Sequence, residues 1–312
     1  MGEAGADWAC PVCGSRDGMP AFRGRGDHIV DLRADQLAPA ATAFGATVGE
    51  VVRCRACGHG SLDRPPSTDD LAHAYAHVED ASSLEESDGQ TATARRDLLG
   101  VRDHLYGPPG RLLDIGCWTG SLLDAAADLG WTPTGVEPST WAAARAVERG
   151  HDVTVGTLDD LDIEAATVQT VTCCDVLEHL DDPAEAARRI AQLLEPGGLL
   201  FATVPDAGSR LARLLGRRWW SVLPMHVQYF TRSSLVALLT GAGFEVVSVR
   251  THPKVFTYRY YADRLGEFVP TVGRPLAGVV GRSPVAERAF GPDLRDRVAV
   301  IARRPRPAGG LR

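Results

Sequence analysis

The stretch RLLDIGCWTGSLLDAAADLG, residues 111–130, contains the pattern that decides the fold. A short apolar run, Arg111–Ile115, ends in a glycine-rich turn, and an amphipathic segment follows from Ser121 to Leu129. This pattern is typical of a strand, a tight turn and a helix. The alternation continues, with further strands expected near 132–136, 153–155, 168–174, 199–204, 244–249 and 298–302, and helices near 140–149, 183–194 and 231–239. It indicates an α/β fold with a mostly parallel sheet.

Two local signals refine these boundaries. Asp182 and Pro183 favour a helix start, because an aspartate caps the free N–H groups and proline suits the first helical position. Pro196-Gly197-Gly198 predicts a turn between the end of that helix and the strand at 199–204.

Ligands of such sheets bind beyond the carboxyl ends of the strands. Asp114 ends the first strand of the series and Glu137 ends the second, where a carboxylate suits the two hydroxyls of a ribose. Gly116 and Gly120 do not have the G-x-G-x-x-G spacing of a dinucleotide site, and Asp114 would repel a pyrophosphate. A cationic ligand with a ribose and no phosphate fits better, which points to S-adenosylmethionine.

Three segments in this order resemble the class I S-adenosylmethionine-dependent methyltransferases. They are LLDIGCWTGSLLDAAADLG (112–130), GVEPS (135–139) and DVLEHLDDPAEAARRIAQLLEPGGLLFATVPD (175–206). The chain looks most like the branch with ubiquinone-type and sugar or natural-product enzymes. HVQYFTRSSLVALLTGAGFEVV (226–247) resembles the segment that those enzymes carry between their fifth and sixth strands. The resemblance implies a Rossmann-like fold with a seven-stranded sheet.

Carried over by position, the resemblance also implies a cofactor site. Asp114, Gly116 and Gly120 would hold the methionine end of the cofactor, and Cys174 and Asp175 would lie beside it. Glu137 would bind the ribose. Pro138, Thr157 and Leu158 would lie along the adenine. Cys117 and Trp118 lie in the same turn and complete the predicted set. Trp118 stands where most relatives have glycine, and its ring either covers the cofactor or acceptor or weakens the site.

Methyl transfer to a hydroxyl benefits from a general base. His179, in the turn Asp175-Val-Leu-Glu178-His179, and His226 are predicted in this role. The alternative is that each only anchors its own loop. In ubiquinone-type relatives an acid-x-x-Glu-His turn binds a divalent cation, so Asp175, Glu178 and His179 are alternative cation ligands.

Aromatic residues suggest where an acceptor would bind. Trp219, Trp220 and Tyr229 are predicted to contact it, although two adjacent tryptophans could instead cover a sheet edge. Residues 253–295 form an insertion before the last strand, interpreted as a lid or an oligomer contact, and a homodimer is a further expectation.

Four of the seven cysteines form two hooks of the type C-x-x-C-G, namely Cys10 with Cys13 and Cys54 with Cys57. Such hooks predict a closed four-thiolate site for structural zinc (Zn²⁺). Unmetallated thiols, a redox pair, or His59 in place of one ligand are the alternatives. The segment 14–53 is longer than a compact ribbon needs, so an extra hairpin or loop is expected there.

The predicted organisation is a zinc ribbon at 1–64, a helical cap at 65–110, a methyltransferase core at 111–252 and 296–305, and the insertion at 253–295. The net charge of −7 and the single lysine, Lys254, count against nucleic-acid binding. The sequence lacks a long apolar run and a secretory start, so we expect a cytoplasmic protein that does not span a membrane.

The favoured function is methylation of a small molecule, most readily an oxygen of a sugar or another metabolite of natural-product biosynthesis. RNA methylation and an inactive scaffold of the same fold with its zinc module are the alternatives.

Overall fold

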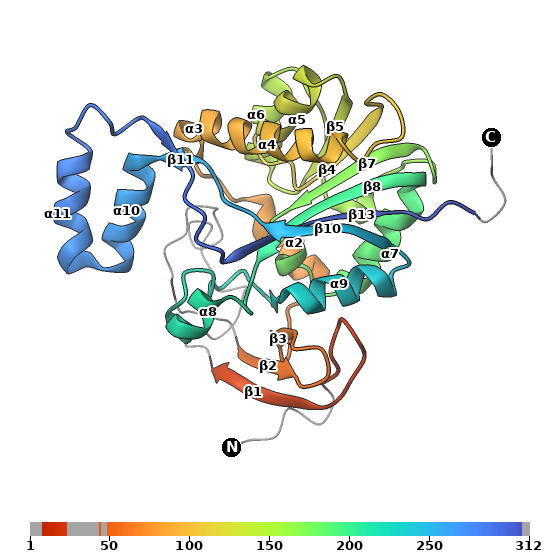
Figure 1. Ribbon diagram of the computed structural model, residues 1–312, viewed down its shortest axis with the longest axis horizontal. Coiled ribbons are helices and arrows are strands. Elements are labelled where there is room, and N and C mark those ends of the chain that lie inside the picture. The colour runs from red at the N-terminus through yellow and green to blue at the C-terminus, as the bar shows by residue number, and fades with distance from the viewer. Residues whose placement is uncertain (1–7, 24–43, 45–48, 308–312) are drawn as a thin grey trace.

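The computed structural model describes residues 8–23, 44 and 49–307 (Figure 1). Most of the segment between the cysteine hooks, where the sequence predicts an extra hairpin or loop, lies outside the described residues, as does the start of the chain at 1–7. Within the described part, no helix is long and apolar enough to cross a membrane.

A seven-stranded sheet forms the centre of the molecule (Figure 1). Its strands are β4 (Arg111–Ile115), β5 (Thr132–Glu137), β6 (Asp152–Val155), β7 (Val168–Cys174), β8 (Leu194–Pro205), β10 (Glu245–Thr251) and β13 (Arg297–Arg303). Their order is β10-β13-β8-β7-β4-β5-β6, and β13 runs antiparallel to both of its neighbours. This confirms the predicted Rossmann-like sheet of class I methyltransferases. The strand order reverses between β4 and β7, where a ligand crevice is expected.

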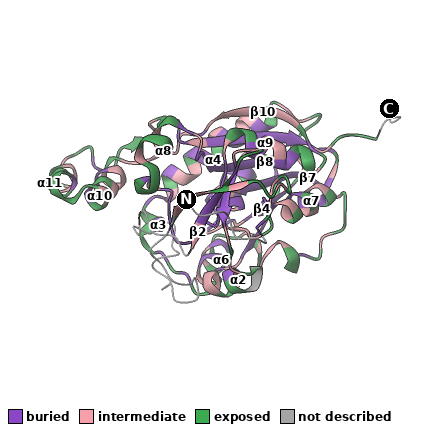
Figure 2. Cartoon of the chain, turned by 90° about the horizontal axis from the view of Figure 1, so that it is seen from below, coloured by how far each residue is buried: buried purple, intermediate pink, exposed green. Residues whose placement is uncertain are grey.

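Helices cover both faces of this sheet. On one face, α4 (Ser87–Arg102) and α5 (Ser121–Asp128) share an apolar cluster with β4 and β8, in which Leu98 packs with Leu112 and Phe201. On the other face, α7 (Pro183–Leu193) and α9 (Arg232–Gly241) contribute to the cluster around Val171. A further helix, α6 (Thr140–Glu148), contacts β5 and β6. Figure 2 shows the buried strands between helices whose outer faces are exposed.

The turn predicted at Pro196-Gly197-Gly198 is wrong, because these residues lie inside β8. The pairing of β7 with β8 shifts there, so that Val168 faces Leu194 while Thr170 faces Leu199. Gly197 has a φ of 91°, a left-handed conformation that glycine adopts readily. The sequence signal for a turn therefore marks a bulge that leaves the strand unbroken.

The N-terminal module is a four-stranded sheet of order β1-β2-β3-β9. Its strands are β1 (Gly18–Arg23), β2 (Glu50–Cys54), β3 (Gly60–Leu62) and β9 (Gln228–Tyr229). The last of these belongs to the segment that follows the fifth strand of the central sheet. Module and core are therefore joined by a shared sheet, and the predicted boundary at residue 64 stays a prediction.

The cap comprises α2 (Thr68–Ala76), α3 (Ser82–Glu85) and α4. Ser139 Oγ donates to Val78 O at 2.7 Å, which ties the cap to the start of α6. The insertion contains β11 (Phe256–Thr257), α10 (Tyr258–Phe268), α11 (Pro270–Val280) and β12 (Ala289–Phe290). Its two helices project to one side of the molecule, at the left of Figure 1.

Candidate functional site

A cavity of about 960 Å³ lies at the carboxyl ends of β4, β5 and β7. The cap helices form one wall, and residues of the insertion, including Lys254, Tyr260 and Phe268, form another. Ligand cavities of 300–1,000 Å³ are usual, so this one has room for a cofactor and an acceptor together.

Asp114 ends β4 and lies against this cavity almost fully buried. Its Oδ1 accepts a hydrogen bond of 2.6 Å from Thr172 Oγ1 of β7. Burial raises the pKa of Asp114 to about 7, although the bond from Thr172 acts against the shift. The two glycines of the turn have positive φ, and a Cβ at Gly116 would come within 2.6 Å of Val176. The positive φ and the side chain of Val176 together disfavour a side chain at Gly116.

Glu137 at the end of β5 fastens this turn to the second strand. Its Oε2 accepts from the backbone N–H of Trp118 at 2.9 Å, and its Oε1 accepts from that of Ser139 at 2.9 Å. Burial raises the pKa of Glu137 to about 7, and the two backbone hydrogen bonds oppose the shift. The carboxylate is thus held in one orientation at the place where a ribose is expected.

Trp118 adopts a φ of 48°, in the left-handed region that favours glycine. Its Nε1 donates to Ser83 Oγ of α3 at 2.9 Å, and its ring centroid lies 5.8 Å from that of Trp141. The tryptophan therefore links the glycine-rich turn to the cap while it lines the cavity.

The structure brings nearly all the predicted cofactor residues to this one cavity. Its wall includes Asp114, Gly116, Cys117, Trp118, Glu137, Pro138, Thr157, Leu158, Cys174 and Asp175. Within the described part of the chain, Gly120 is the one predicted member away from the wall. It precedes the first residue of α5 as that helix's N-cap, with a φ of 87°.

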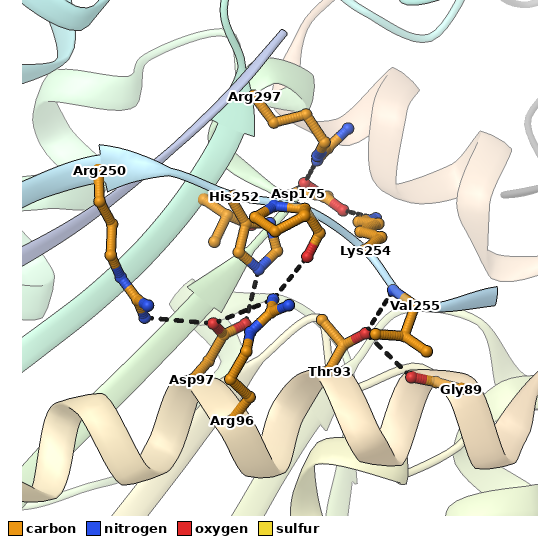
Figure 3. A network of polar contacts seen from close by, with 12 residues as sticks. Gly89, Thr93, Arg96, Asp97, Asp175, Arg250, His252, Lys254, Val255 and Arg297 are labelled. Atoms are coloured by element: carbon orange, nitrogen blue, oxygen red, sulfur yellow. Dashed lines mark hydrogen bonds and ion pairs between the residues drawn. The ribbon is translucent and has the colours of Figure 1, made fainter. Parts of the chain in front are cut away.

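Asp175, directly after β7, forms ion pairs with Lys254 and Arg297, as Figure 3 shows. Lys254 opens the insertion and Arg297 begins β13, so this clamp fixes the insertion to the strand ends. Thr203 Oγ1 also donates to Asp175 Oδ1 at 3.2 Å. Lys254 and Arg297 were missed from the sequence; that Lys254 is the single lysine of the chain was the one available signal.

His179 and His226 lie next to each other, with ring centroids 4.8 Å apart. His226 Nδ1 is 2.8 Å from Ser221 O, and His179 Nδ1 is 3.1 Å from Met225 O. A carbonyl only accepts, so the Ser221 contact assigns the proton of His226 to Nδ1 and leaves its Nε2 with a lone pair. Burial lowers the pKa of His226 to about 4 and that of His179 well below its usual value. Both rings are therefore neutral near pH 7.

Two more polar groups complete this cluster. Tyr75 of α2 was missed from the sequence, and its hydroxyl lies 2.6 Å from His179 Nδ1. Glu178 is buried, its Oε2 has no hydrogen-bond partner among the described residues, and burial raises the pKa of its carboxyl to about 8.

One ligand atom each from Glu178, His179 and His226 lies within 4.8 Å of the others. Two imidazoles and a carboxylate are a common donor set for divalent transition metals. The cation set predicted from the sequence was Asp175, Glu178 and His179, and the structure replaces Asp175 by His226. Asp175 is instead engaged by Lys254 and Arg297.

The four cysteines of the two hooks converge in the N-terminal module, each with its Sγ within 4.8 Å of the others. All are free thiols, and the Cys10–Cys57 and Cys13–Cys54 sulfurs are each 3.6 Å apart. Zn–S bonds of about 2.3 Å in a tetrahedron place sulfurs about 3.8 Å apart, so the donor set fits zinc. His59 lies outside this cluster and contacts Gln228 at 2.9 Å.

The predicted acceptor residues separate. Trp220 lines the main cavity, whereas Trp219 and Tyr229 line a second cavity between the module and α8 (Arg210–Leu215). The indole N–H groups of both tryptophans point to Asp296, at 3.5 Å for Trp219 and 2.8 Å for Trp220. Both indoles therefore meet at one carboxylate although their rings line different cavities.

Residues 91–249 match the family described as Methyltransferase domain. The chain belongs to this family. The matched residues include the glycine-rich turn, Glu137, His179 and His226. The four-cysteine module and the insertion lie outside the match.

Curated relatives are similar over the same part. The ubiquinone biosynthesis O-methyltransferase of Paracidovorax citrulli is 39% identical over 157 residues, which are 45% of this chain and 65% of the relative. That of Xanthomonas euvesicatoria is 38% identical over 169 residues, 50% of this chain and 70% of the relative. That of Vibrio parahaemolyticus is 39% identical over 111 residues, 33% of this chain and 46% of the relative. The chain thus spans less than two thirds of the length of two of these relatives.

Among solved structures, the [4+2]-cyclase SpnF is 25% identical, with a TM-score of 0.46. The match covers 68% of this chain and 81% of that one.

Proposed function

We propose that this protein is an S-adenosylmethionine-dependent O-methyltransferase of a small hydroxylated acceptor. One observation carries the proposal. The two buried carboxylates at the ends of β4 and β5 line the same cavity as a pair of neutral imidazoles, so cofactor and base would face one another across it.

The residues present fit the cofactor. Asp114 is a buried carboxylate with room beside it for an ammonium group, and Glu137 is oriented by backbone N–H groups for the ribose hydroxyls. When bound, S-adenosylmethionine supplies a methyl group on a positively charged sulfur, already activated for displacement. The protein's share is then to align the acceptor, exclude water and remove a proton.

The histidine pair supports the proton transfer. With Nδ1 of His226 committed to Ser221 O, its Nε2 is the free basic atom, and the ring of His179 lies beside it with Nδ1 3.1 Å from Met225 O. A positioned base of this kind contributes about 10²–10⁴-fold to rate.

The aromatic residues of the cavity wall and the names of the relatives support a chemical class for the acceptor. Trp220, Tyr260 and Phe268 line the cavity, and aromatic walls suit a flat, partly apolar molecule. The relatives are named for ubiquinone biosynthesis, which favours a hydroxylated quinone precursor over the sugar expected from the sequence. We therefore propose a hydroxyl on an aromatic ring as the methylated group.

A divalent cation on Glu178, His179 and His226 is the second candidate arrangement, favoured by the unpartnered Oε2 of Glu178. Bound there, a cation would lower the pKa of the acceptor hydroxyl, and the two histidines would act as its ligands.

Calorimetry with S-adenosylmethionine tests the cofactor first. Binding near micromolar that Glu137→Ala abolishes, and that a change of the exposed Glu148 to Ala leaves intact, supports the proposal. Absence of binding to the zinc-loaded protein contradicts it and favours the inactive scaffold.

Methyl transfer to 3,4-dihydroxybenzoate, with and without Mg²⁺, then tests the acceptor class. His226→Asn should lower turnover about 100-fold with unchanged cofactor affinity. Dependence of turnover on the added cation would favour the second arrangement.

A further inference from the structure

The N-terminal module and the methyltransferase domain are connected at β3 and β9. Gly60 pairs with Tyr229 and Ser61 with Gln228 in antiparallel register. Leu62 N also donates to Val227 O at 3.0 Å. The strand that follows the second cysteine hook is thus hydrogen-bonded to the segment that directly follows His226.

His59 makes a side-chain link between the two parts. It follows the Cys54–Cys57 hook, and Cys54 N donates to its carbonyl at 2.7 Å. Its imidazole is fully buried, packs on Phe230 with ring centroids 4.6 Å apart, and places Nε2 2.9 Å from Gln228 Oε1. Because an amide oxygen only accepts, His59 Nε2 carries the proton and donates.

Gln228 passes this contact on to the turn that carries Glu178 and His179, the 3₁₀ turn η3 (Leu177–His179). Its Nε2 donates to Leu180 O at 2.9 Å and to Asp181 O at 3.2 Å. Beside it, Val227 N donates to Glu178 O at 2.9 Å. The amide of Gln228 therefore bridges the module on one side and the end of η3 on the other.

We propose that the four-cysteine module positions the histidine pair of the site, with His59 and Gln228 as the positioning residues. They hold the segment 225–228 against the turn 177–181, so that the rings of His179 and His226 keep their mutual distance. The effect of this positioning on catalysis rests on the proposed function. The link from the module through His59 and Gln228 to the turn 177–181 does not depend on it.

The proposed link also explains two features that zinc binding alone does not explain. His59 is a buried imidazole next to a cysteine hook, yet it lies outside the four-cysteine cluster and contacts Gln228. All polar atoms of the buried Gln228 side chain are engaged, and each partner lies on an element of the link. A buried amide left without partners is costly, so this geometry is strongly preferred.

Gln228→Met tests the link, with Gln169→Met as the matched control. Gln169 lies in β7 at the opposite end of the sheet, and both ends of its amide are bonded to the loop before β4: its Oε1 accepts from Gly110 N at 2.8 Å and its Nε2 donates to Pro108 O at 3.0 Å. Hydrogen exchange is measured on the zinc-loaded protein. We expect exchange at the His179 and Leu180 amides to become about tenfold faster in Gln228→Met and to stay unchanged in Gln169→Met.

Nitrogen-15 spectra of the imidazoles give a readout that simple loss of stability would not move. In the parent protein each histidine should show a single tautomer: Nδ1–H for His226, set by Ser221 O, and for His179 the tautomer selected by its contacts with Tyr75 and Met225 O. Gln228→Met should produce a tautomer mixture for both, and Gln169→Met should not. S-adenosylhomocysteine affinity should be the same in both variants, because the link does not touch the cofactor residues.

If Gln228→Met does not fold, His59→Gln and His59→Leu replace it. Glutamine keeps a donor for Gln228 and should retain the parent exchange pattern, while leucine should lose it. Equal exchange in Gln228→Met and Gln169→Met, or a single unchanged tautomer at both histidines, would overturn the proposal even if the protein methylates its acceptor. Failure of methyl transfer with the expected exchange pattern would leave the link standing and refute the proposed function.

Discussion

The two parts added to the methyltransferase domain are attached in opposite ways. The four-cysteine module shares a sheet with the core through β9, and its Val51, Cys54 and Leu62 are almost fully buried. The α10–α11 hairpin projects from the core, and α11 exposes Val272 and Val279 by 64% and 68%. The module is therefore a fixed part of the fold. The hairpin is held near its base by the Lys254–Asp175 clamp and by Glu86, which accepts hydrogen bonds from Thr257.

Removal of one hook ligand should have the largest effect. Cys54→Ser breaks the closed four-thiolate set, and loss of a structural metal belongs to the changes that cost more than about 4 kcal/mol. We expect Tm to fall by about 10 °C or more and zinc content to drop, measured by calorimetry and elemental analysis. Cys174→Ser, a cavity cysteine outside the hooks, should keep its zinc. Unchanged Tm in Cys54→Ser would contradict a structural metal on the hooks.

Cofactor affinity should depend on pH through the strand-end carboxylates of the core. The pKa of Asp114 and of Glu137 is raised to about 7 by burial, so at pH 6 both carry their protons in the free protein. A cationic ligand needs the ionised forms, so each of the two carboxyls should raise the affinity by up to about tenfold per pH unit below pH 7, and the affinity should level off above pH 8. Calorimetry across this range measures it. Asp114→Asn should flatten the curve, and a flat curve in the parent protein would contradict the assignment.

The hairpin's clamp should matter less than the module's hooks. Lys254→Met leaves Asp175 with Arg297, and the lost pair is about a quarter exposed, so we expect a cost of about 1 kcal/mol and a fall in Tm of about 2 °C. Hydrogen exchange should become faster in 253–268 and stay unchanged in the module. Lys254→Arg keeps the charge and should restore the parent pattern. A fall in Tm as large as that of Cys54→Ser would show that both parts are equally integral to the fold.

The exposed face of α11 should have the smallest effect on stability. Val279→Ser changes a side chain that is mostly in solvent, and such changes stay within about 0.5 kcal/mol. We expect Tm to move by less than about 2 °C. Sedimentation of the same variant distinguishes the two interpretations of the insertion, because an oligomer contact would weaken whereas a lid would not alter the molecular mass.

Local patterns were sufficient for the parts of the molecule that local chemistry determines. The strand–turn–helix at 111–130 and the strand ends Asp114 and Glu137 follow from hydrophobic period and glycine placement, and the sheet they predict is the observed one. Pro196-Gly197-Gly198 has the composition of a turn, but pairing with β7 turns it into a bulge. That pairing is a tertiary effect, and no window of sequence contains it.

The residues of the site were also predictable only where local sequence determines their position. Residues at strand ends converge because the topology requires it, which is why the predicted cofactor residues share one cavity. Tyr75 and Lys254 reach the cavity from the cap and the insertion, whose placement depends on packing between distant segments. Trp219 and Trp220 line different cavities, a separation that depends on the position of the turn after α8 and that their adjacency in sequence does not reveal.

The shared strand also has a consequence for how the chain is made. His59 and Gln228 are 169 positions apart, so the module leaves the ribosome long before its fourth strand exists. Until then β3 is an open edge, and unpaired edges are sites where nascent chains pair with the wrong partner. Metal loading of the hooks during synthesis would keep the three early strands together while the rest of the protein is translated.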